Sequence, residues 1–177
     1  AGLEPEAGVS AIMAAAEGVS HMKLLRVDEE TTANIGTFKA EGPTNIVSSY
    51  AKVIAEARST DLTKLEQQER DMVKAMQDAC DRHGATLKYT TARSYNPYKV
   101  TPEDKVCQLL EKAYRALNCE VHYVRSGGGC DSNIHNEHGI QSVGIGIGMV
   151  KAHTGQENIA VDQLNKTALL ALELMKA

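Results

Sequence analysis

The chain has 177 residues, of which 19 are Lys or Arg and 23 are Asp or Glu, so its formal net charge is −4 at pH 7. This acidic balance, with a sequence pI near 5.9, argues against a nucleic-acid partner. No apolar run approaches the roughly 20 residues that span a bilayer, which argues against a membrane partner. Four cysteines without a Cys-x-x-Cys pair predict reduced thiols and a cytoplasmic location.

The first part of the chain is predicted to begin with a helix and two strands. Pro5 suits the first turn of a helix from Glu4 to Lys23. The apolar stripe of this helix consists of Val9, Ile12, Met13, Ala16 and Val19. Side-chain alternation then predicts strands at Thr31–Lys39 and Ser49–Ala57, on either side of the turn-rich segment 41–45.

A long helix and a further strand complete this part. The polar residues 59–61 offer an N-cap and Gly84 a stop for a helix from Leu62 to Arg82. Residues Leu87–Tyr95 alternate as a strand. The order helix, strand, strand, helix, strand is that of a ferredoxin-like β-α-β-β-α-β domain that lacks its first strand. We therefore predict an α+β domain over residues 1–97.

The second part, residues 98–177, follows a proline-containing hinge. Thr101-Pro-Glu-Asp104 has the form of a capping box that opens a helix. The further predicted elements are a strand at Glu120–Arg125, a helix at Asp131–His138, a strand at Val143–Met149 and a helix at Ile159–Lys176. This order predicts parallel strands of an α/β sheet, which need cover on both faces. Two strands are too few for an independent core, so we expect this part to be incomplete.

Two features of the second part have the composition of functional sites. The glycine turn 126–130 could cradle a phosphate, but its spacing fits neither the P-loop nor the dinucleotide fingerprint. The alternative is a tight strand-to-helix turn that is capped by Asp131 or Ser132. The order His-Asn-Glu-His at 135–138 is not the His-Glu-x-x-His of zincins, so a metal site there is disfavoured. His153 stands alone after a predicted strand.

Three segments of the second part nevertheless follow one another in a recognisable order. They are Ser126–Asn133, Val143–Met149 and Ala152–Asn158. Together they resemble the C-terminal end of the catalytic domain in one family of two-zinc peptidases. That family includes peptidase T, the aminoacylases and allantoate amidohydrolase.

The first part resembles the lid domain of the same family. Residues 1–12 look like the segment that follows the lid-domain histidine, and Gly42–Val47 resembles a Gly-x-x-Asn-x-Val element. Ser48 departs from the proline that usually comes next. Glu56-Ala-Arg58 resembles the family's acidic-x-Arg strand end. The resemblance thus covers nearly the whole chain and implies a ferredoxin-like lid joined to a C-terminal fragment of an α/β zinc-peptidase domain.

The resemblance also implies roles for individual residues. His153 corresponds to a zinc ligand, and a neutral imidazole is a common ligand of zinc. Asn45 and Arg58 correspond to lid residues that bind the substrate's backbone or carboxylate, often across a dimer. The glycine turn corresponds to a wall of the substrate cleft, with Gly128, Gly129 and Asp131 as substrate-binding residues.

The family's remaining ligands and its general base have no counterpart in this chain. We therefore expect no catalytic residue and no tightly bound zinc here, although the intact enzyme would hold two zinc ions. We interpret the chain as part of a cytoplasmic zinc aminopeptidase that hydrolyses short peptides and forms a homodimer through its lid. The substrate could be a tripeptide, a dipeptide or another amide. The alternative is a non-catalytic ferredoxin-like module that dimerises or binds a small molecule.

Overall fold

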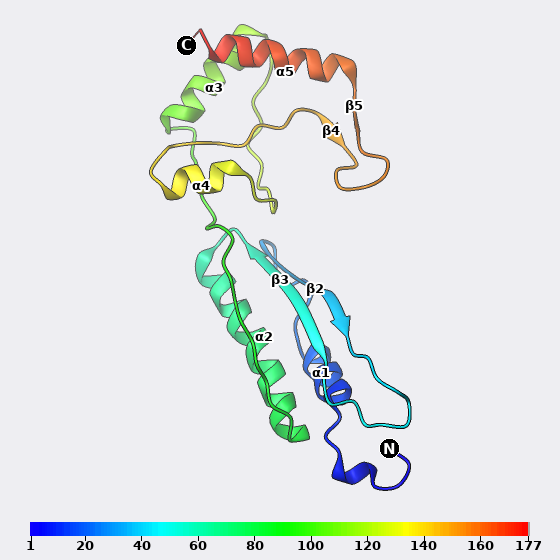
Figure 1. The fold of residues 1–177 in the computed structure, drawn as a ribbon. Helices are drawn as coiled ribbons and strands as arrows, with labels where there is room; N and C mark the ends of the chain where they lie inside the picture. Colours follow the sequence, from blue (N-terminus) through cyan, green and yellow to red (C-terminus); the bar gives the residue numbers. More distant parts are fainter. Residues whose placement is uncertain (177) are drawn as a thin grey trace. The chain divides into compact units, whose positions relative to one another are not determined.

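The computed structural model describes residues 1–176, and Ala177, the last residue of the predicted second part, lies outside the described residues. The chain forms two compact units, Ala1–Pro97 and Tyr98–Ala177 (Figure 1). Both units combine helices with a small antiparallel sheet, so the mixed α/β fold class predicted from the sequence is confirmed. Within residues 1–176, no helix is long and apolar enough to cross a membrane.

The first unit contains a three-stranded antiparallel sheet and two α-helices. Its elements are η1 (Pro5–Ala7), α1 (Ala11–Ser20), β1 (Leu25–Arg26), β2 (Thr31–Lys39), β3 (Lys52–Ser59) and α2 (Leu62–His83). The strands pair in the order β1-β2-β3. This arrangement fits a ferredoxin-like lid without its leading strand. The predicted bounds of β2 are confirmed, and those of β3 and α2 differ from the prediction by only a few residues.

The single helix predicted for Glu4–Lys23 is wrong, because the chain is interrupted before α1. Gly8 has extended backbone angles, with φ −99° and ψ 148°. The side chain of Ser10 accepts the backbone N–H of Met13 at 3.4 Å and so acts as the N-cap of α1. Glycine weakens a helix and serine favours a cap, so the helix begins at Ala11.

The buried face of α1 is made of small residues, and the large apolar stripe predicted for this helix is mostly exposed. Ala14, Ala15 and Gly18 are buried, whereas Ile12 is 43% exposed. A Cβ added to Gly18 would lie 3.1 Å from the backbone Cα of Met76 in α2. The two helices therefore approach too closely for larger side chains, which is why the prediction from apolar size was wrong.

The strand predicted at Leu87–Tyr95 is also wrong. Leu87 packs against the core cluster of the first unit instead of joining the sheet. Arg93 Nη2 donates to Glu66 Oε1 of α2 at 3.0 Å, so the segment runs along α2 (Figure 1). The buried members of the cluster are Ala14, Met76 and Cys80. Side-chain alternation predicts a strand but does not identify the strand with which it would pair.

The second unit contains three helices and a two-stranded sheet. Its elements are α3 (Lys105–Ala116), α4 (Asp131–Glu137), β4 (Met149–Val150), β5 (Asn158–Ile159) and α5 (Val161–Leu174). The strand predicted at Glu120–Arg125 is absent from the described residues, and only the last residue of the one predicted at Val143–Met149 lies in a strand. The β4–β5 pair is antiparallel and joins segments other than the two strands for which parallel pairing was expected.

The helix that starts the second unit is capped differently from the prediction. Asp104 Oδ2 accepts the backbone N–H of Thr101 at 2.7 Å, and α3 starts only after this turn. Gln141 then supplies the cap, because its Oε1 accepts the N–H of Val106 at 3.2 Å and its Nε2 donates to Asp104 Oδ1 at 2.6 Å. A long-range amide thus replaces the local capping box.

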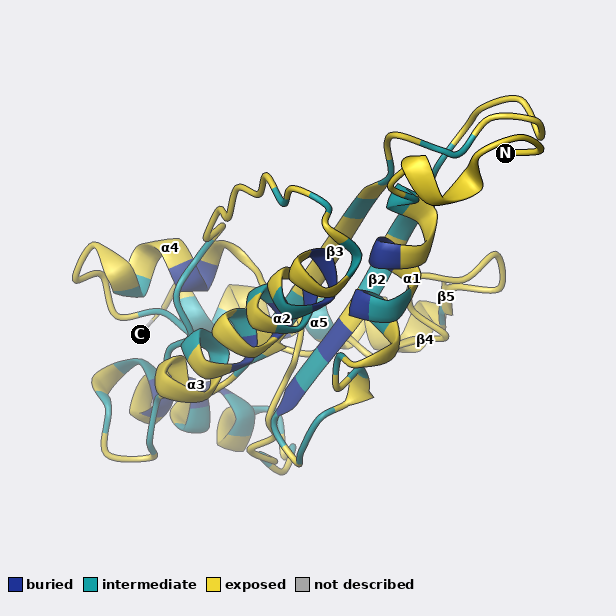
Figure 2. Cartoon of the chain, turned by 90° about the horizontal axis from the view of Figure 1, so that it is seen from below, coloured by how far each residue is buried: buried dark blue, intermediate teal, exposed yellow. Residues whose placement is uncertain are grey.

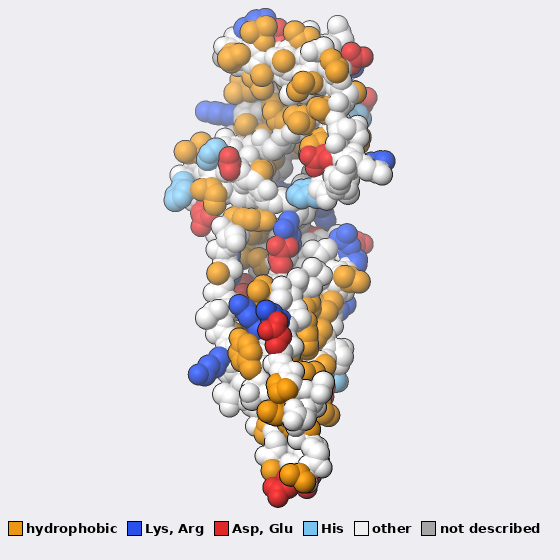
Figure 3. Space-filling model, turned by 45° about the vertical axis from the view of Figure 1, so that its right-hand side comes forward, with side chains coloured by type: hydrophobic (Ala, Val, Ile, Leu, Met, Phe, Trp, Pro, Cys, Tyr) orange, Lys and Arg blue, Asp and Glu red, His pale blue; other side chains and the backbone are white. Residues whose placement is uncertain are grey.

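Much apolar surface of the second unit is exposed. Figure 2 shows exposed residues of this unit in yellow, and Figure 3 shows hydrophobic side chains on its surface in orange. The exposed apolar residues of the 145–172 region are Ile145, Ile147, Met149, Val150, Val161, Leu164, Leu169 and Leu172. Only Leu170 of α5 is buried. Exposed apolar residues that gather into a patch commonly mark an interface.

The close contact between α1 and α2 generates the first prediction. We expect Gly18→Val to destabilise the first unit by about 1–3 kcal/mol, because the new side chain must displace the backbone of Met76. Urea unfolding monitored by circular dichroism would measure the change. Ala16→Val introduces the same side chain at an exposed position of α1 and is the control. Helix propensity alone would make Gly18→Val slightly stabilising and Ala16→Val slightly destabilising, so a Gly18→Val variant that loses no stability would contradict the role of the contact.

Asp28 orders the turn that leads into β2. Its Oδ1 accepts the backbone N–H groups of Glu30 at 2.9 Å and Thr31 at 2.8 Å, and Lys64 Nζ lies 3.5 Å from Oδ2. These contacts, the Glu30 N–H first, lower the pKa of Asp28 from 3.8 to about 2. The ionised carboxylate is therefore the form that the folded turn favours.

A depressed carboxyl pKa makes the stability of the turn pH-dependent. The contribution of Asp28 is complete above about pH 4 and is lost as the pH falls towards 2. We expect Asp28→Asn to lower stability at pH 6 and to flatten its pH dependence between pH 4 and 2. Thermal unfolding across this range would measure both effects, with Asp71→Asn on α2 as the control. A variant with the slope of the unmutated protein would contradict the assignment.

Candidate functional site

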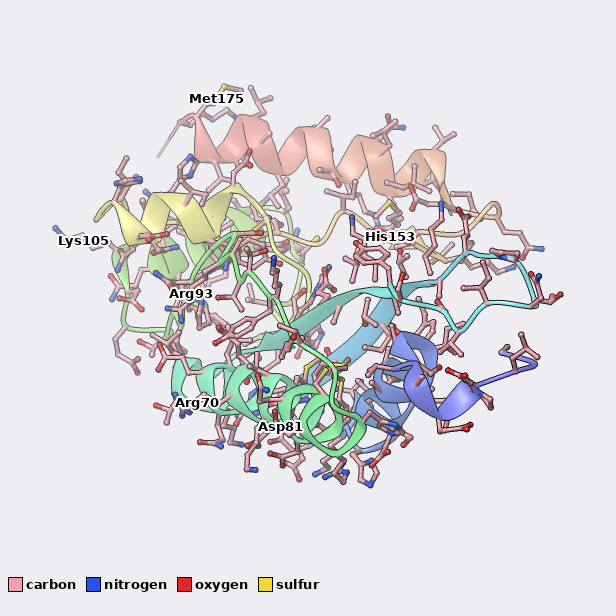
Figure 4. All side chains as sticks on the ribbon, turned by 60° about the horizontal axis from the view of Figure 1, so that its bottom comes forward. Arg70, Asp81, Arg93, Lys105, His153 and Met175 are labelled. Atoms are coloured by element: carbon pink, nitrogen blue, oxygen red, sulfur yellow. The ribbon has the colours of Figure 1, made fainter. Side chains whose placement is uncertain are left out.

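His153 lies on the loop that joins β4 to β5 (Figure 4). Its backbone is in the left-handed region with φ 63°, and that of Lys151 has φ 55°. The His153 N–H donates to Glu157 Oε2 at 2.7 Å, and Thr154 Oγ1 donates to the Lys151 carbonyl at 2.8 Å. These bonds stabilise a turn that non-glycine residues rarely adopt. The loop presents His153 at an exposed position.

The residues around His153 do not by themselves form a metal site. A catalytic zinc ion commonly needs three protein ligands. Across residues 1–176, no group of three His, Cys, Asp or Glu residues could hold a metal ion. His135 Nδ1 lies 3.3 Å from Ser142 Oγ, so this ring faces the chain that follows α4. A metal ion bound by His153 would require ligands supplied from elsewhere.

The glycine turn before α4 is open and exposed. Gly128 donates its N–H to Ser126 Oγ at 3.2 Å, so this group is already satisfied inside the turn. A Cβ added to Gly127 would meet no atom within 4 Å. Gly129 is exposed as well. The turn therefore leaves space for close approach of another chain or a ligand, as glycines allow.

Two asparagines that the sequence analysis did not consider fix α4. Cys130 is the N-cap residue, and its N–H donates to Asn133 Oδ1 at 3.0 Å, so the expected cap by Asp131 or Ser132 is wrong. Asn136 Nδ2 donates to the carbonyl of Ser132 at 2.7 Å and also to the chain beyond the helix. Both asparagines satisfy backbone groups at the ends of a short helix. Asp131 is the exposed first residue of α4.

Arg58 and Glu56 form a two-pronged ion pair on β3. Arg58 Nε lies 2.7 Å from Glu56 Oε1, and Nη2 lies 3.0 Å from Oε2. The hydrogen bond that Arg58 donates to Glu56 raises the pKa of Arg58 above its ordinary value, and the same bond lowers the pKa of Glu56. Each charge compensates the other. A substrate carboxylate that reached Arg58 would therefore compete with Glu56.

Asn45 and Arg58 do not meet within one copy of the chain. Asn45 lies in the loop between β2 and β3, next to the end where Lys52 pairs with Lys39. Arg58 pairs with Thr32 near the other end of the ladder. At about 3.4 Å per residue, Lys52 and Arg58 lie about 20 Å apart along β3. The two residues cannot share one small ligand inside a single unit.

The sheet of the first unit has one covered and one open face. Val53 packs against the core beneath the helices, so alternation places Glu56 and Arg58 on the opposite, open face. The register aligns Arg26 with Thr32 and Thr32 with Arg58. These three residues form one row across the three strands of the open face.

An open pocket of about 340 Å³ lies beside this row. It is lined by Leu25, Arg26, Thr32, Ala33, Asn34 and Glu56. Asn34 stands opposite Glu56 in the ladder, one step along the open face from the row. The sequence analysis missed Arg26 because a strand of two residues is too short to give an alternation signal. It passed over Asn34 as an ordinary exposed strand position.

Comparison with known proteins supports a peptidase lid. Residues 1–84 match the family model described as a peptidase dimerisation domain. The chain is 36% identical over 176 residues to the uncharacterised protein YqjE of Bacillus subtilis. That similarity covers 99% of this chain and 47% of YqjE.

Two solved structures resemble the chain closely. One is the aminopeptidase PepT from Bacillus cereus, with 37% identity and a TM-score of 0.87 over 98% of this chain and 47% of that one. The other is a tripeptidase from Staphylococcus aureus, with 38% identity and a TM-score of 0.90 over 98% of this chain and 46% of that one. The chain spans about half the length of these relatives.

The fold and these similarities identify the chain as a relative of aminopeptidases. The first unit matches the model of a peptidase dimerisation domain, and the chain as a whole is similar to an aminopeptidase PepT and to a tripeptidase. The family resemblance inferred from the glycine turn, the His153 segment and the lid motifs is confirmed.

Proposed function

We propose that this chain is the lid and the C-terminal part of the catalytic domain of a zinc-dependent aminopeptidase that hydrolyses short peptides. The observation that carries the proposal is the similarity to PepT and to a tripeptidase at 37% and 38% identity over 98% of the chain. Both relatives are about twice as long as this chain. The proposed activity therefore depends on residues that this chain does not contain.

The exposed apolar surface of the second unit supports a larger catalytic domain. Ile145, Ile147 and Met149 lie before the β4–β5 loop and are 39%, 39% and 44% exposed. Gly148, with φ 84°, lets this segment approach α5 closely, because an added Cβ would lie 2.9 Å from Gln163. Further strands and helices of a peptidase domain would cover such a surface.

In the proposed enzyme, His153 is a zinc ligand and the Glu157 carboxylate holds its backbone in place. The remaining ligands and the general base come from outside this chain. Zinc would activate water and polarise the scissile carbonyl. The open glycine turn, with Gly128, Gly129 and Asp131, forms part of the wall of the peptide cleft. The free thiols of all four cysteines support a cytoplasmic location.

Asn45 and Arg58 bind the peptide in this proposal, from two different copies of the chain. The loop that holds Asn45 adjoins the Lys52 end of β3, about 20 Å along the strand from Arg58, and this supports such a division, because a tripeptide's carboxylate and backbone cannot reach both residues within one unit. The peptidase dimerisation domain over residues 1–84 supports a homodimer. The alternative of a purely non-catalytic module would use the same surface for association alone.

The proposed activity has a direct test. The longer protein that contains this chain should release the N-terminal residue of trialanine in the presence of zinc, whereas the 177-residue chain alone should not. His153→Ala should lower kcat/KM by at least about a hundredfold, because a zinc ligand is lost. His138→Ala at the end of α4 is the matched control and should remain active. Turnover and stoichiometric zinc in the 177-residue chain would contradict the proposal.

Self-association is the second prediction of this proposal. β3 is an edge strand of the described sheet, and an uncovered edge invites pairing with another chain. We expect a dimer by light scattering after size exclusion. Ile54 and Ala55 are neighbours on β3, so the N–H of one points towards β2 and the N–H of the other points away from it. Proline at the position whose N–H points away should give a folded monomer, and proline at the other position should disrupt the sheet. A folded dimer in both variants, or a monomeric parent protein at high micromolar concentration, would contradict edge pairing.

A further inference from the structure

Two extended segments of the first unit have a backbone edge without a strand partner. β3 pairs with β2 on one side only, because the described sheet has the order β1-β2-β3. Residues 87–95 alternate in the sequence as a strand, but within residues 1–176 they form no backbone–backbone hydrogen bond. Extended backbone commonly satisfies its N–H and C=O groups by pairing with another strand. Both segments are therefore able to accept one.

The two segments are parallel to each other, because both run antiparallel to α2. Val53 near the start of β3 and Leu87 near the start of the later segment pack against the core cluster, whose members from α2 lie in the second half of that helix. Further along, Arg93 donates to Glu66 in the first half of α2 at 3.0 Å (Figure 1). In a split β-α-β arrangement, one strand lies between two such parallel segments and is antiparallel to both.

Side chains next to these edges are more exposed than their places in the alternation predict. Ala55 follows Val53 on the helix side of β3, yet it is exposed. Tyr89 follows Leu87 in the same way and is 60% exposed. The packed face of a sheet normally buries its apolar side chains against the core. A strand between the two segments would cover both residues.

The backbone of Ala1 lies at the end of the sheet that such a strand would reach. A strand antiparallel to β3 runs towards the end at which Lys39 pairs with Lys52. The loop between β2 and β3 lies at this end, and the carbonyl of its Asn45 accepts a hydrogen bond from the nitrogen of Ala1 at 3.1 Å. The chain spans about half the length of its relatives, which leaves polypeptide to supply the strand.

We propose that the position between β3 and residues 87–95 accepts one strand, supplied by the segment that directly precedes Ala1 in the longer protein. β3 has eight residues and spans about 27 Å, so the inserted strand has a similar length. It pairs antiparallel with both edges and makes residues 87–95 the outer strand of the sheet. Its alternate side chains are apolar and cover Ala55 and Tyr89.

This inference concerns the lid alone and does not depend on peptide hydrolysis. It also gives the self-association of the 177-residue chain a physical cause, because the edge of β3 that pairs with a second copy is the edge that the inserted strand occupies in the longer protein. Dimerisation of the longer protein then uses another surface of the lid.

Amide hydrogen exchange tests the inference on two forms of the protein. One is the 177-residue chain, and the other is the same chain extended before Ala1 by about twelve residues of its own preceding sequence, enough for a strand and a connection. Amides of residues 87–95 and alternate amides of β3 should exchange at least about tenfold more slowly in the extended chain. The longer protein should show the same protection. An extension with the same residues in scrambled order is the control and should give none.

Two neighbouring threonines provide a matched pair of variants. Successive N–H groups of a strand point to opposite sides, so only one of Thr90 and Thr91 directs its N–H at the inserted strand. In the 177-residue chain, Thr90→Pro and Thr91→Pro should both leave the unfolding midpoint unchanged, because neither N–H is paired. In the extended chain, the proline that removes the paired N–H should lower the midpoint and abolish the protection, whereas the other should be tolerated.

The opposing outcomes are equally specific. Unchanged exchange in the extended chain and the longer protein, or equal effects of the two prolines in the extended chain, would each overturn the inference. Protection of residues 87–95 that rises with the concentration of the 177-residue chain would mean that a second copy supplies the strand, which also overturns it. The proposed function fails separately, if the longer protein with zinc hydrolyses no tripeptide.

Discussion

The close contact of α1 with α2 determines what the first unit can do. Gly18 allows the backbone of Met76 to approach, and the two helices can then share one core with Val53 on a single face of the sheet. Because side chains alternate between the two faces of a strand, Glu56 and Arg58 lie on the face that no helix of this unit covers. A larger residue at position 18 would separate the helices and loosen the platform on which the open face depends. The polar row is therefore a consequence of packing on the opposite side of the sheet.

The second unit is held together in another way. Its ordered turns depend on side-chain amides that bridge distant backbone groups, namely Gln141 at the start of α3 and Asn136 at the end of α4. Such bonds fix local geometry but bury little apolar surface. Apolar residues such as Ile145 and Leu164 stay exposed as a result. This combination of well-defined turns and uncovered apolar side chains is expected of a layer that packs against further polypeptide.

The sequence predicted those elements whose signals are local. Strand β2 and helix α2 carry alternation, an acidic N-cap at Asp61 and a left-handed glycine at position 84, and the structure has them where they were expected. The prediction of a strand at Leu87–Tyr95 failed because local alternation does not specify the strand with which a segment pairs. The prediction of the buried face of α1 failed because Gly18 sets the distance between α1 and α2, and this distance decides which side chains fit between the two helices. For the candidate site, the order of the motifs identified the family, but no pattern could single out Arg26, whose neighbours are set by strand register.

The two arginines of the open face show how similar side chains acquire different roles. Arg58 has a carboxylate partner two residues away on its own strand, so its position is fixed and its charge is compensated. Arg26 has a cross-strand threonine as its neighbour, so its charge remains available. An incoming carboxylate gains most from a cation that gives up no existing ion pair, because breaking one offsets the new bond. The acidic residue of the acidic-x-Arg element thus gives two arginines of one row different electrostatic surroundings.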